Sequence, residues 1–415
     1  MITDLARKST PSSFDADICI IGAGAAGITI ARELNNSNIK VLLLESGGLE
    51  YEQPTQNLYK AENISFKQFP IETTRLRYFG GTTNHWGGMC YQLDEFDFNR
   101  SYPNNSGWPF TKAELHSYYN RAQNICQLGE AIYYSKEASS RIDDDYQLNF
   151  KTGMFKTVFF QRSPPTRFGL IYRKELELSE NINVLLHANL KVLNQSSDGK
   201  QISTASVVTI DGREFTVKAD TFILAAGGLE NPRILLNSPG KNNVGIGNSN
   251  NLVGRYYMDH ISAYIGKIIF TKPIAADTPF FTEHKVRSAQ FGAFLSPSIK
   301  MLEKTNCGNF RLNFTPSTKN DLAIETLKSV KRDISNLEWP SQLIEKASLL
   351  ISNADAFANL AYKNIFDTTD ELFKTKHESS SQLCHVMINL EQSPNFSSRV
   401  TLSDKLDAIG LPLLR

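Results

Sequence analysis

The chain has 415 residues, 41% of them hydrophobic, which suffices for the cores of about two or three domains. Its 44 basic and 43 acidic residues leave a formal charge of +1 and form no long block of one sign, which argues against a nucleic-acid or anionic-membrane surface. The five cysteines include no C-x-x-C pair and the seven histidines show no metal-ligand spacing, so we expect a reducing compartment and no metal site.

The N-terminal residues 1–17 lack the hydrophobic core of a signal peptide, and their polar Pro11–Ser13 stretch predicts a loose leader. The longest apolar run, 18–31, is interrupted by glycines and is too short to span a bilayer. We therefore expect a cytoplasmic protein without a membrane span.

The stretch 18–45 has the pattern of strand, glycine turn, helix and second strand. Gly22, Gly24 and Gly27 keep the G-x-G-x-x-G spacing, which serves a tight turn, close approach to a pyrophosphate and helix-strand packing in that order. Glu45 ends the second strand, where a carboxylate accepts hydrogen bonds from an adenosine ribose. The pattern predicts a site for FAD or NAD, and the acid disfavours NADP; the alternative is a glycine-rich turn without a ligand.

The run RLRYFGGTTNHWGGM at 75–89 places two glycine pairs around a polar and aromatic centre, which on spacing alone indicates an aromatic turn. Its central part resembles the flavin-contacting motif of the glucose-methanol-choline (GMC) oxidoreductase family, especially the branch related to pyranose oxidase and the sugar-acid dehydrogenases. The resemblance implies that these residues contact a bound FAD: Gly80, Gly81, Thr82, Asn84 and His85. In that branch the histidine can carry the flavin covalently, so His85 is expected either to form that bond or to pack beside the ring.

The next predicted helix covers 112–128, with Thr111 and Glu114 at capping-box spacing. The acidic triplet 143–145 lacks further ligands at calcium-loop spacing, so it indicates a solvated turn. Strands of a small meander are then predicted at 181–192, 205–210 and 214–217.

The run TFILAAGGLENPRILL at 221–236 predicts a buried strand, a turn of small residues and a helix. It resembles the second dinucleotide-domain motif of the GMC family, which implies that Ala225 and Gly227 approach the cofactor. The alternative is tight packing of the helix on the sheet. In the same family a residue at the position of Leu190 offers its backbone to the adenine, so the resemblance adds Leu190 to the expected cofactor contacts.

The segment NLVGRYYMDH at 251–260 resembles the stretch that leads from the FAD domain to the substrate domain in this family. Its Asp259 and His260 are expected to have a structural polar role, because the family's proton-transfer site is not this pair. Beyond it, strands are predicted at 263–270, 289–295, 310–314 and 385–390. Apolar residues at helical spacing predict a helical insertion within 324–360.

The last segment, 391–415, resembles the start of the family's C-terminal region. In the family, the histidine that accepts the substrate's hydroxyl proton follows this segment. The last histidine of the chain, His385, begins a predicted buried strand and is expected to belong to the core. The resemblance therefore implies no catalytic residue within 1–415, and the catalytic histidine is expected beyond Arg415.

Together these patterns predict an α/β fold: a Rossmann-like FAD/NAD(P)-binding domain and a substrate domain of antiparallel sheet plus helices. The FAD-binding domain is expected from 15–100 and 180–255, and an incomplete substrate domain from 100–180 and 256–415. The resemblance implies an FAD-dependent oxidoreductase that passes hydride from a CH–OH group of a sugar or polyol to flavin N5, with the electron acceptor left open. The alternatives are a non-catalytic flavin-binding or interaction protein and an NAD-dependent dehydrogenase.

Overall fold

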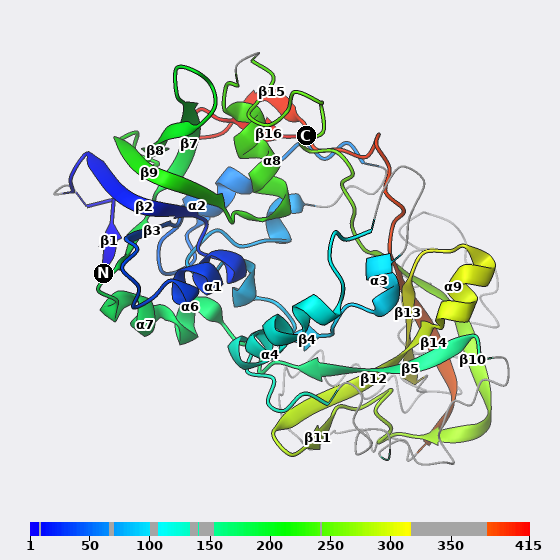
Figure 1. Ribbon diagram of the computed structural model, residues 1–415. Helices are drawn as coiled ribbons and strands as arrows, with labels where there is room; N and C mark the ends of the chain where they lie inside the picture. Colours follow the sequence, from blue (N-terminus) through cyan, green and yellow to red (C-terminus); the bar gives the residue numbers. More distant parts are fainter. Residues whose placement is uncertain are drawn as a thin grey trace, which may run out of the picture.

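The computed structural model describes residues 1–7, 10–65, 70–99, 107–132, 140, 153–240, 243–316 and 380–415. These residues form two large sheets that lie side by side, with the N-terminus beside the edge strand of the first (Figure 1). The predicted helical insertion within 324–360 and the acidic triplet 143–145 lie outside the described residues.

The first sheet has seven strands in the order β1-β6-β3-β2-β9-β8-β7. They are β1 (Ile2–Asp4), β2 (Ser13–Ile21), β3 (Val41–Leu44), β6 (Ile182–Leu186), β7 (Asn189–Gln195), β8 (Ile202–Val208) and β9 (Glu214–Leu224). Neighbours from β1 to β9 pair in parallel, and β9, β8 and β7 form an antiparallel meander. Every residue of β3 is buried, as expected of a parallel strand covered on both faces.

Some details of this sheet differ from the expectation. The N-terminal residues are not a loose leader, because β1 pairs with β6 and Leu5 is fully buried behind it. The predicted strand 181–192 is two strands, since His187 has a left-handed backbone (φ 54°) that separates β6 from β7. The predicted strand 214–217 is only the beginning of β9, which continues beside β2 as far as its last residue.

Helices cover both faces of the first sheet. They are α1 (Ala25–Glu33), α6 (Phe168–Ile171), α7 (Arg173–Leu178) and α8 (Gly227–Asn237). On one face, Ile28 of α1 and Leu176 of α7 pack against Leu43 of β3. On the other, Ile234 of α8 packs with Leu42 of the same strand, so neighbouring residues of β3 enter two separate cores.

The second sheet is antiparallel and has the order β10-β14-β13-β12-β5-β4, with β11 beside β12. Its strands are β4 (Met89–Cys90), β5 (Phe155–Arg162), β10 (Ile261–Ala275), β11 (His284–Val286), β12 (Ala289–Pro297), β13 (Phe310–Pro316) and β14 (Ser380–Leu390). The four strands predicted after residue 260 are confirmed. Phe159, Phe291 and Phe314 are buried together on one face of this sheet.

The helix predicted after Thr111 is present and starts with the expected acid contact, because the Thr111 N–H donates to Glu114 Oε2 at 2.8 Å. A 3-10 turn at Ala113–Leu115 leads into α4 (His116–Ile125). The helix ends before the predicted limit because Gln127 has a left-handed backbone (φ 54°). The remaining short helices are α2 (Gln53–Gln56), α3 (Glu95–Asn99) and α9 (Ile299–Thr305).

The C-terminal residues form a hairpin of β15 (Leu402–Leu406) and β16 (Pro412–Leu414), which lies beside α8 (Figure 1). Arg233 of α8 donates to Asp407 in the hairpin at 2.7 Å, and Leu414 accepts a backbone hydrogen bond from Glu62 at 2.8 Å. The hairpin therefore packs with the first sheet, whereas the predicted division assigned all of 256–415 to the substrate domain.

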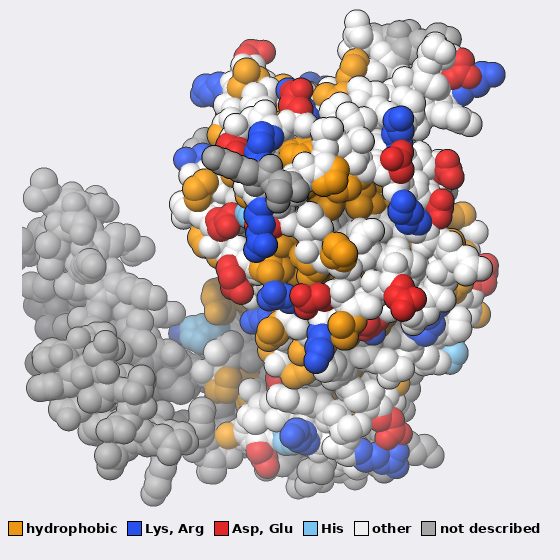
Figure 2. Space-filling model, turned by 90° about the vertical axis from the view of Figure 1, so that its left-hand side faces the viewer, with side chains coloured by type: hydrophobic (Ala, Val, Ile, Leu, Met, Phe, Trp, Pro, Cys, Tyr) orange, Lys and Arg blue, Asp and Glu red, His pale blue; other side chains and the backbone are white. Residues whose placement is uncertain are grey.

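Basic and acidic side chains are interspersed on the face drawn in Figure 2, with no large field of one sign. This distribution agrees with the near-equal numbers of basic and acidic residues. Among the helices within the described ranges, none has the length and apolar character needed to cross a bilayer.

Candidate functional site

A cavity of about 440 Å³, here named the nucleotide cavity, opens at the carboxyl ends of β2, β3 and β9. Ligands of open parallel sheets bind at this edge, where strand ends and helix N-termini meet. Of the residues expected to contact the cofactor, the structure places these in its wall: Gly22, Gly24, Glu45, Gly81, Thr82, Leu190, Ala225 and Gly227. Segments far apart in the sequence thus converge as the motifs predict.

The three glycines of the fingerprint have three different surroundings. Gly22 has φ +104°, and a methyl group there would lie 2.7 Å from the Ala225 carbonyl oxygen. A methyl group on Gly27 would lie 1.8 Å from the Gly22 carbonyl oxygen, so this position requires close contact of α1 with the turn. Around Gly24 there is nothing within 4 Å, which leaves space for a phosphate at the N-terminus of α1.

Glu45 lies at the end of β3 and is only 5% exposed. Its carboxylate accepts hydrogen bonds from the backbone N–H of Ala23 at 3.0 Å and of Gly47 at 2.9 Å. Burial raises the pKa of Glu45, although these hydrogen bonds and the nearby Arg77 act in the opposite direction. Oε1 also accepts from the Ser46 hydroxyl at 3.3 Å. Oε2 keeps a second lone pair, which can accept a hydroxyl of the adenosine ribose.

A buried ionic cluster, which the sequence analysis missed, forms part of the same wall. Arg75 and Arg77 donate to Glu230 of α8 at 3.0 and 3.4 Å, and their guanidinium groups lie 3.9 and 4.7 Å from the centre of the Tyr59 ring. Burial would raise the pKa of Glu230, but the neighbouring arginines, with Arg233 among them, lower it. The only sequence signal was the Arg-x-Arg pair before Gly80, which says nothing about a partner at position 230.

Arg77 brings its guanidinium group to the cavity wall, where it is 8% exposed. Its Nε, like that of Arg75, is buried without a hydrogen-bond partner in the described residues. A guanidinium group beside an open helix N-terminus suits a ligand that carries phosphates. The residues present therefore fit a dinucleotide such as FAD.

Gly80 and Asn84 do not line the nucleotide cavity, but their hydrogen bonds hold the predicted flavin motif in place. Gly80 donates its backbone N–H to Ala23 at 2.8 Å, and Asn84 donates its side-chain amide to Phe79 at 3.0 Å. Both contacts hold the 3-10 helix Gly81–Asn84 against the glycine turn. His85 follows it, is exposed, and does not belong to the wall of the nucleotide cavity.

Two further cavities continue from the nucleotide cavity toward the second sheet. The middle cavity, of about 720 Å³, shares Tyr59, Thr82 and Asn231 with the nucleotide cavity. It shares Met258 with the outer cavity, of about 760 Å³, which lies on the antiparallel sheet. The three cavities thus form a row from the end of β3 to β12, β13 and β14.

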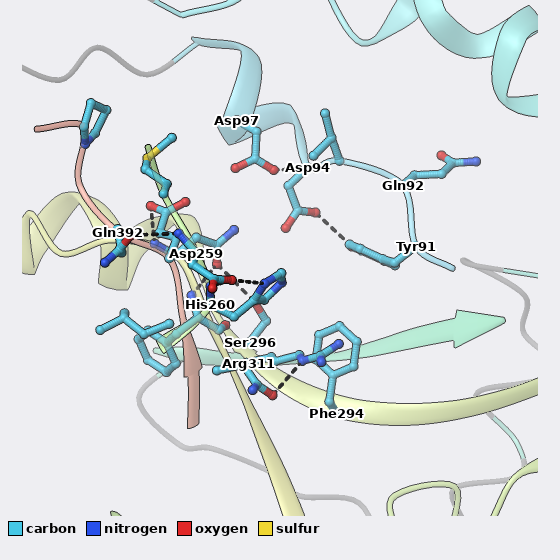
Figure 3. Close-up of a pocket in the computed structure, with 18 of the residues that line it drawn as sticks. Tyr91, Gln92, Asp94, Asp97, Asp259, His260, Phe294, Ser296, Arg311 and Gln392 are labelled. Carbon is cyan, nitrogen blue, oxygen red and sulfur yellow. Dashed lines mark hydrogen bonds and ion pairs between the residues drawn. The ribbon is translucent and has the colours of Figure 1, made fainter. Parts of the chain in front are cut away.

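The outer cavity has a polar wall (Figure 3). Asp94 accepts hydrogen bonds from Tyr91 at 3.0 Å and Lys156 at 3.0 Å, and Arg311 of β13 donates to Asn389 of β14 at 2.9 Å. Among the residues that the structure describes, no group of three His, Cys, Asp or Glu side chains is arranged to hold a metal ion.

Asp259 and His260 also line the outer cavity. Their side chains are 50% and 82% exposed, and the His260 backbone N–H donates to Asp259 at 2.7 Å. The pair therefore lines the outer cavity, and its expected structural polar role stays a prediction.

A family model described as pyridine nucleotide-disulphide oxidoreductase matches residues 16–260, more than half of the chain. The chain belongs to this family. Its curated relatives and solved neighbours confirm the GMC recognition, the Rossmann-like FAD-binding fold and FAD as the cofactor.

Two relatives illustrate the similarity of this GMC chain to characterised proteins. The fructose dehydrogenase large subunit of Gluconobacter japonicus is 23% identical over 322 residues, which cover 60% of this chain and 59% of the relative. The 6'''-hydroxyparomomycin C oxidase of Streptomyces lividus is 23% identical over 321 residues, which cover 64% and 58%. The chain thus spans less than two thirds of these curated relatives.

Among solved structures, pyridoxine 4-oxidase from Mesorbium loti superposes with a TM-score of 0.50 at 14% identity. The superposition covers 96% of this chain and 75% of the oxidase. At this identity the likeness concerns the fold.

Proposed function

We propose that this GMC chain carries the FAD-binding and substrate-binding parts of an enzyme that oxidises a CH–OH group of a sugar or polyol. The proposal rests on the row of three cavities. This row connects the nucleotide cavity at the first sheet to the polar wall of the outer cavity on the antiparallel sheet. The names of its relatives, among them a fructose dehydrogenase and a 2-methyl-1,2-propanediol dehydrogenase, describe compounds with hydroxyl groups.

The first sheet and its ionic cluster hold the adenosine half of the cofactor in this proposal. Glu45 accepts a ribose hydroxyl, the N-terminus of α1 faces the phosphates and the backbone of Leu190 faces the adenine. When bound, FAD supplies the hydride acceptor, while the protein determines position and electrostatics.

The second sheet provides the substrate side. Ser296, Asn389 and Arg311 present hydroxyl, amide and guanidinium groups to the outer cavity, a donor and acceptor set that suits a hydroxylated molecule. This proposal assigns the proton-accepting role to none of the described histidines. His260 is exposed, and its Nδ1 lies 3.7 Å from Asp259, so no close partner among the described residues orients the ring.

The same proposal divides the chain between the two sheets. The motifs predict an FAD-binding domain of 15–100 and 180–255, and we add to it the edge strand β1 and the hairpin of β15 and β16 that packs on α8. The substrate domain takes 100–180 and the rest of 256–415. Strand β4 pairs with β5 of the second sheet, so the first boundary lies before Met89 in the sheet itself.

A titration with FAD tests the proposal. We expect this chain to bind FAD, to quench its fluorescence, and, under anaerobic conditions, to lose visible flavin absorbance when a reducing sugar or polyol is added. A chain that binds FAD but is not bleached by any sugar or polyol supports the non-catalytic alternative. A chain that ignores FAD and binds NADH is an NAD-dependent dehydrogenase.

Acid precipitation of the flavin-loaded protein determines whether His85 is covalently bound to the flavin. A yellow pellet that turns colourless in the His85→Ala variant shows a covalent bond to this residue. A colourless pellet from the unmodified chain shows that the flavin is not covalently bound.

A further inference from the structure

Arg311 faces the outer cavity from β13, close to Phe294 and Ser296 of β12 (Figure 3). Its Nε donates to Asn389 Oδ1 at 2.9 Å, and one Nη lies 2.8 Å from the sulfur of Met89. A guanidinium has five N–H donors. No further hydrogen bond and no ion pair of Arg311 occurs within the described part of the chain, so three donors remain for a ligand.

Within the described residues no carboxylate pairs with Arg311, in contrast to several other arginines of this protein. Arg32, Arg162 and Arg233 each donate to a carboxylate at 2.8 Å or less. Burial and the nearby Arg162 lower the pKa of Arg311, as expected of a cation without a counter-ion. A half-buried charge of this kind is costly until an anion pairs with it.

The guanidinium is also held in a fixed orientation. Asn389 accepts from Asn313 at 2.9 Å and donates to Ser262 at 2.5 Å, so the amide that binds Arg311 Nε is itself fixed. The Phe294 ring lies 5.8 Å from the centre of the guanidinium. A fixed planar fork is suited to an anion with two oxygen atoms and binds it without much loss of side-chain entropy.

The acidic side chains of the outer cavity are already engaged by the protein. Asp94 pairs with Lys156 at 3.0 Å and also accepts from Tyr91. Asp97 accepts from the Asp94 backbone at 2.9 Å, and Glu391 accepts from the Asn309 backbone at 2.7 Å. Asp259 accepts the His260 backbone N–H at 2.7 Å. Arg311 is the arginine of this wall that no described carboxylate pairs with, so we expect an anionic group of a ligand to bind at its guanidinium.

We propose that Arg311 binds an anionic oxygen group, a carboxylate or a phosphate, on the hydroxylated substrate of the outer cavity. The choice of this cavity as the substrate site rests on the proposed function. The anionic group serves as a handle and does not react. It orients the molecule on the sheet so that a CH–OH group elsewhere on it points toward the middle cavity.

Calorimetric titration of the FAD-loaded chain with four probes tests the proposal: D-gluconate, D-glucose 6-phosphate, D-glucitol and D-glucosamine. We expect gluconate or glucose 6-phosphate to bind at least about 10-fold more tightly than glucitol, because charge-assisted hydrogen bonds replace contacts with water. The tighter of the two anions tells whether the handle is a carboxylate or a phosphate. Equal binding of anion and glucitol, or tighter binding of glucosamine, overturns the proposal.

Variants connect the preference to the residue. Arg311→Leu is expected to weaken anion binding about 10- to 100-fold and to leave glucitol binding unchanged. The affinity of Arg311→Lys for the anion is expected to lie between that of the unmodified chain and that of Arg311→Leu, because lysine keeps the charge without the planar fork. The exposed Arg287→Leu, on the same sheet, is the matched control and should bind like the unmodified chain. Unchanged anion binding in Arg311→Leu overturns the proposal, and Arg311→Lys gives the same decision if the leucine variant does not fold.

Combining the titration with the flavin-reduction assay separates this inference from the proposed function. Anion binding that depends on Arg311, together with a flavin that no sugar reduces, contradicts the proposed function and leaves the anion site standing. Flavin reduction by neutral polyols without any anion preference contradicts the anion site alone.

Discussion

At the glycine turn, the glycines of one motif have different physical roles, and substitution separates them. A methyl group on Gly27 would meet the Gly22 carbonyl oxygen at 1.8 Å, so Gly27→Ala must push α1 away from β2. We expect the free energy of unfolding of the cofactor-free chain to fall by about 1–3 kcal/mol. Gly24→Ala has an ordinary backbone angle (φ −86°) and nothing within 4 Å, so the fold should keep its stability.

The Gly24→Ala variant should instead lose affinity for FAD, because its methyl group occupies the space left for the phosphates. Urea unfolding without cofactor and fluorescence titration with FAD measure the two effects. The assignment of roles is wrong if Gly24→Ala binds FAD like the unmodified chain, or if it loses as much stability as Gly27→Ala.

Glu45→Gln tests the ribose contact. The amide keeps the size of the side chain but turns one of the two acceptor oxygens into a donor, which faces the N–H of Ala23 or Gly47. We expect the Kd for FAD to rise about 10- to 100-fold, the range for hydrogen bonds to a charged group. The exposed Glu50→Gln is the control, and equal Kd values for the two variants would count against a ribose contact at Glu45.

At the scale of helices and strands, the side chain of His187 links the edge strand β1 to the rest of the first sheet. His187 Nδ1 lies 2.6 Å from Asp4 at the end of β1, and its Nε2 lies 2.9 Å from Glu52 before α2. Burial favours the neutral ring, but the two carboxylates outweigh it and raise the pKa of His187 above 6.5. The two contacts of the protonated His187 ring, here named the His187 clamp, therefore stabilise the fold fully below about pH 6.5. This stabilisation is lost as the pH rises through the raised pKa of His187.

Thermal unfolding of His187→Gln at several pH values tests the clamp. We expect the Tm of the variant to lie furthest below that of the unmodified chain at about pH 6, and the gap to shrink as the pH rises further. His116→Gln, on the exposed side of α4, should show no such trend. A gap that stays constant or grows with pH would exclude a charged clamp.

The C-terminal hairpin is held by a buried ion pair. Arg233 and Asp407 are 3% and 2% exposed in their side chains, and Leu411 of the hairpin lines the nucleotide cavity. Asp407→Ala leaves the buried arginine with backbone carbonyls and, as carboxylate partner in the described residues, only the more distant Glu230, so we expect a loss of about 3–5 kcal/mol and weaker FAD binding. Urea unfolding and FAD titration measure both.

Lys405→Met is the matched control for the hairpin. Lys405 pairs with Glu62 at 2.6 Å, but its side chain is 72% exposed, so its removal should cost less than about 1 kcal/mol. If the two variants lose the same stability, the buried pair is not what holds the hairpin on α8.

On the scale of the whole molecule, the row of cavities requires both sheets. The chain crosses between them several times: β4 and β5 of the second sheet come between β3 and β6 of the first. The described residues include those proposed to bind the adenosine half of FAD, whereas no described histidine is held in place toward the outer cavity. A positioned general base contributes about 10²- to 10⁴-fold to such a reaction.

We therefore expect residues 1–415 to bind FAD but to oxidise sugars slowly, and added imidazole to accelerate flavin reduction by supplying a base. Stopped-flow measurement of flavin absorbance with and without imidazole tests this expectation. Rapid reduction without imidazole would contradict it. His260→Asn would then show whether His260 is the base, since it lines the outer cavity.

Local features of the sequence already determined much of this protein. The spacing of Gly22, Gly24 and Gly27 and the acid at Glu45 predicted the nucleotide cavity, because tight turns and strand ends depend on backbone sterics within a short segment. Alternating and continuous apolar runs predicted most strands of both sheets, because the pattern of a short segment records which of its faces are buried. The family resemblance added FAD and the loop after Phe79.

Only the tertiary structure brought together what lies far apart in the chain. Glu230 meets Arg75 and Arg77 across more than a hundred positions, and the anion-free Arg311 meets the outer cavity through strands β12, β13 and β14. The edge strand β1 was likewise missed, because its burial comes from pairing with β6 and not from its own pattern. Periodicity records which face of an element is buried, but the partner of a buried charge is decided by how the elements pack.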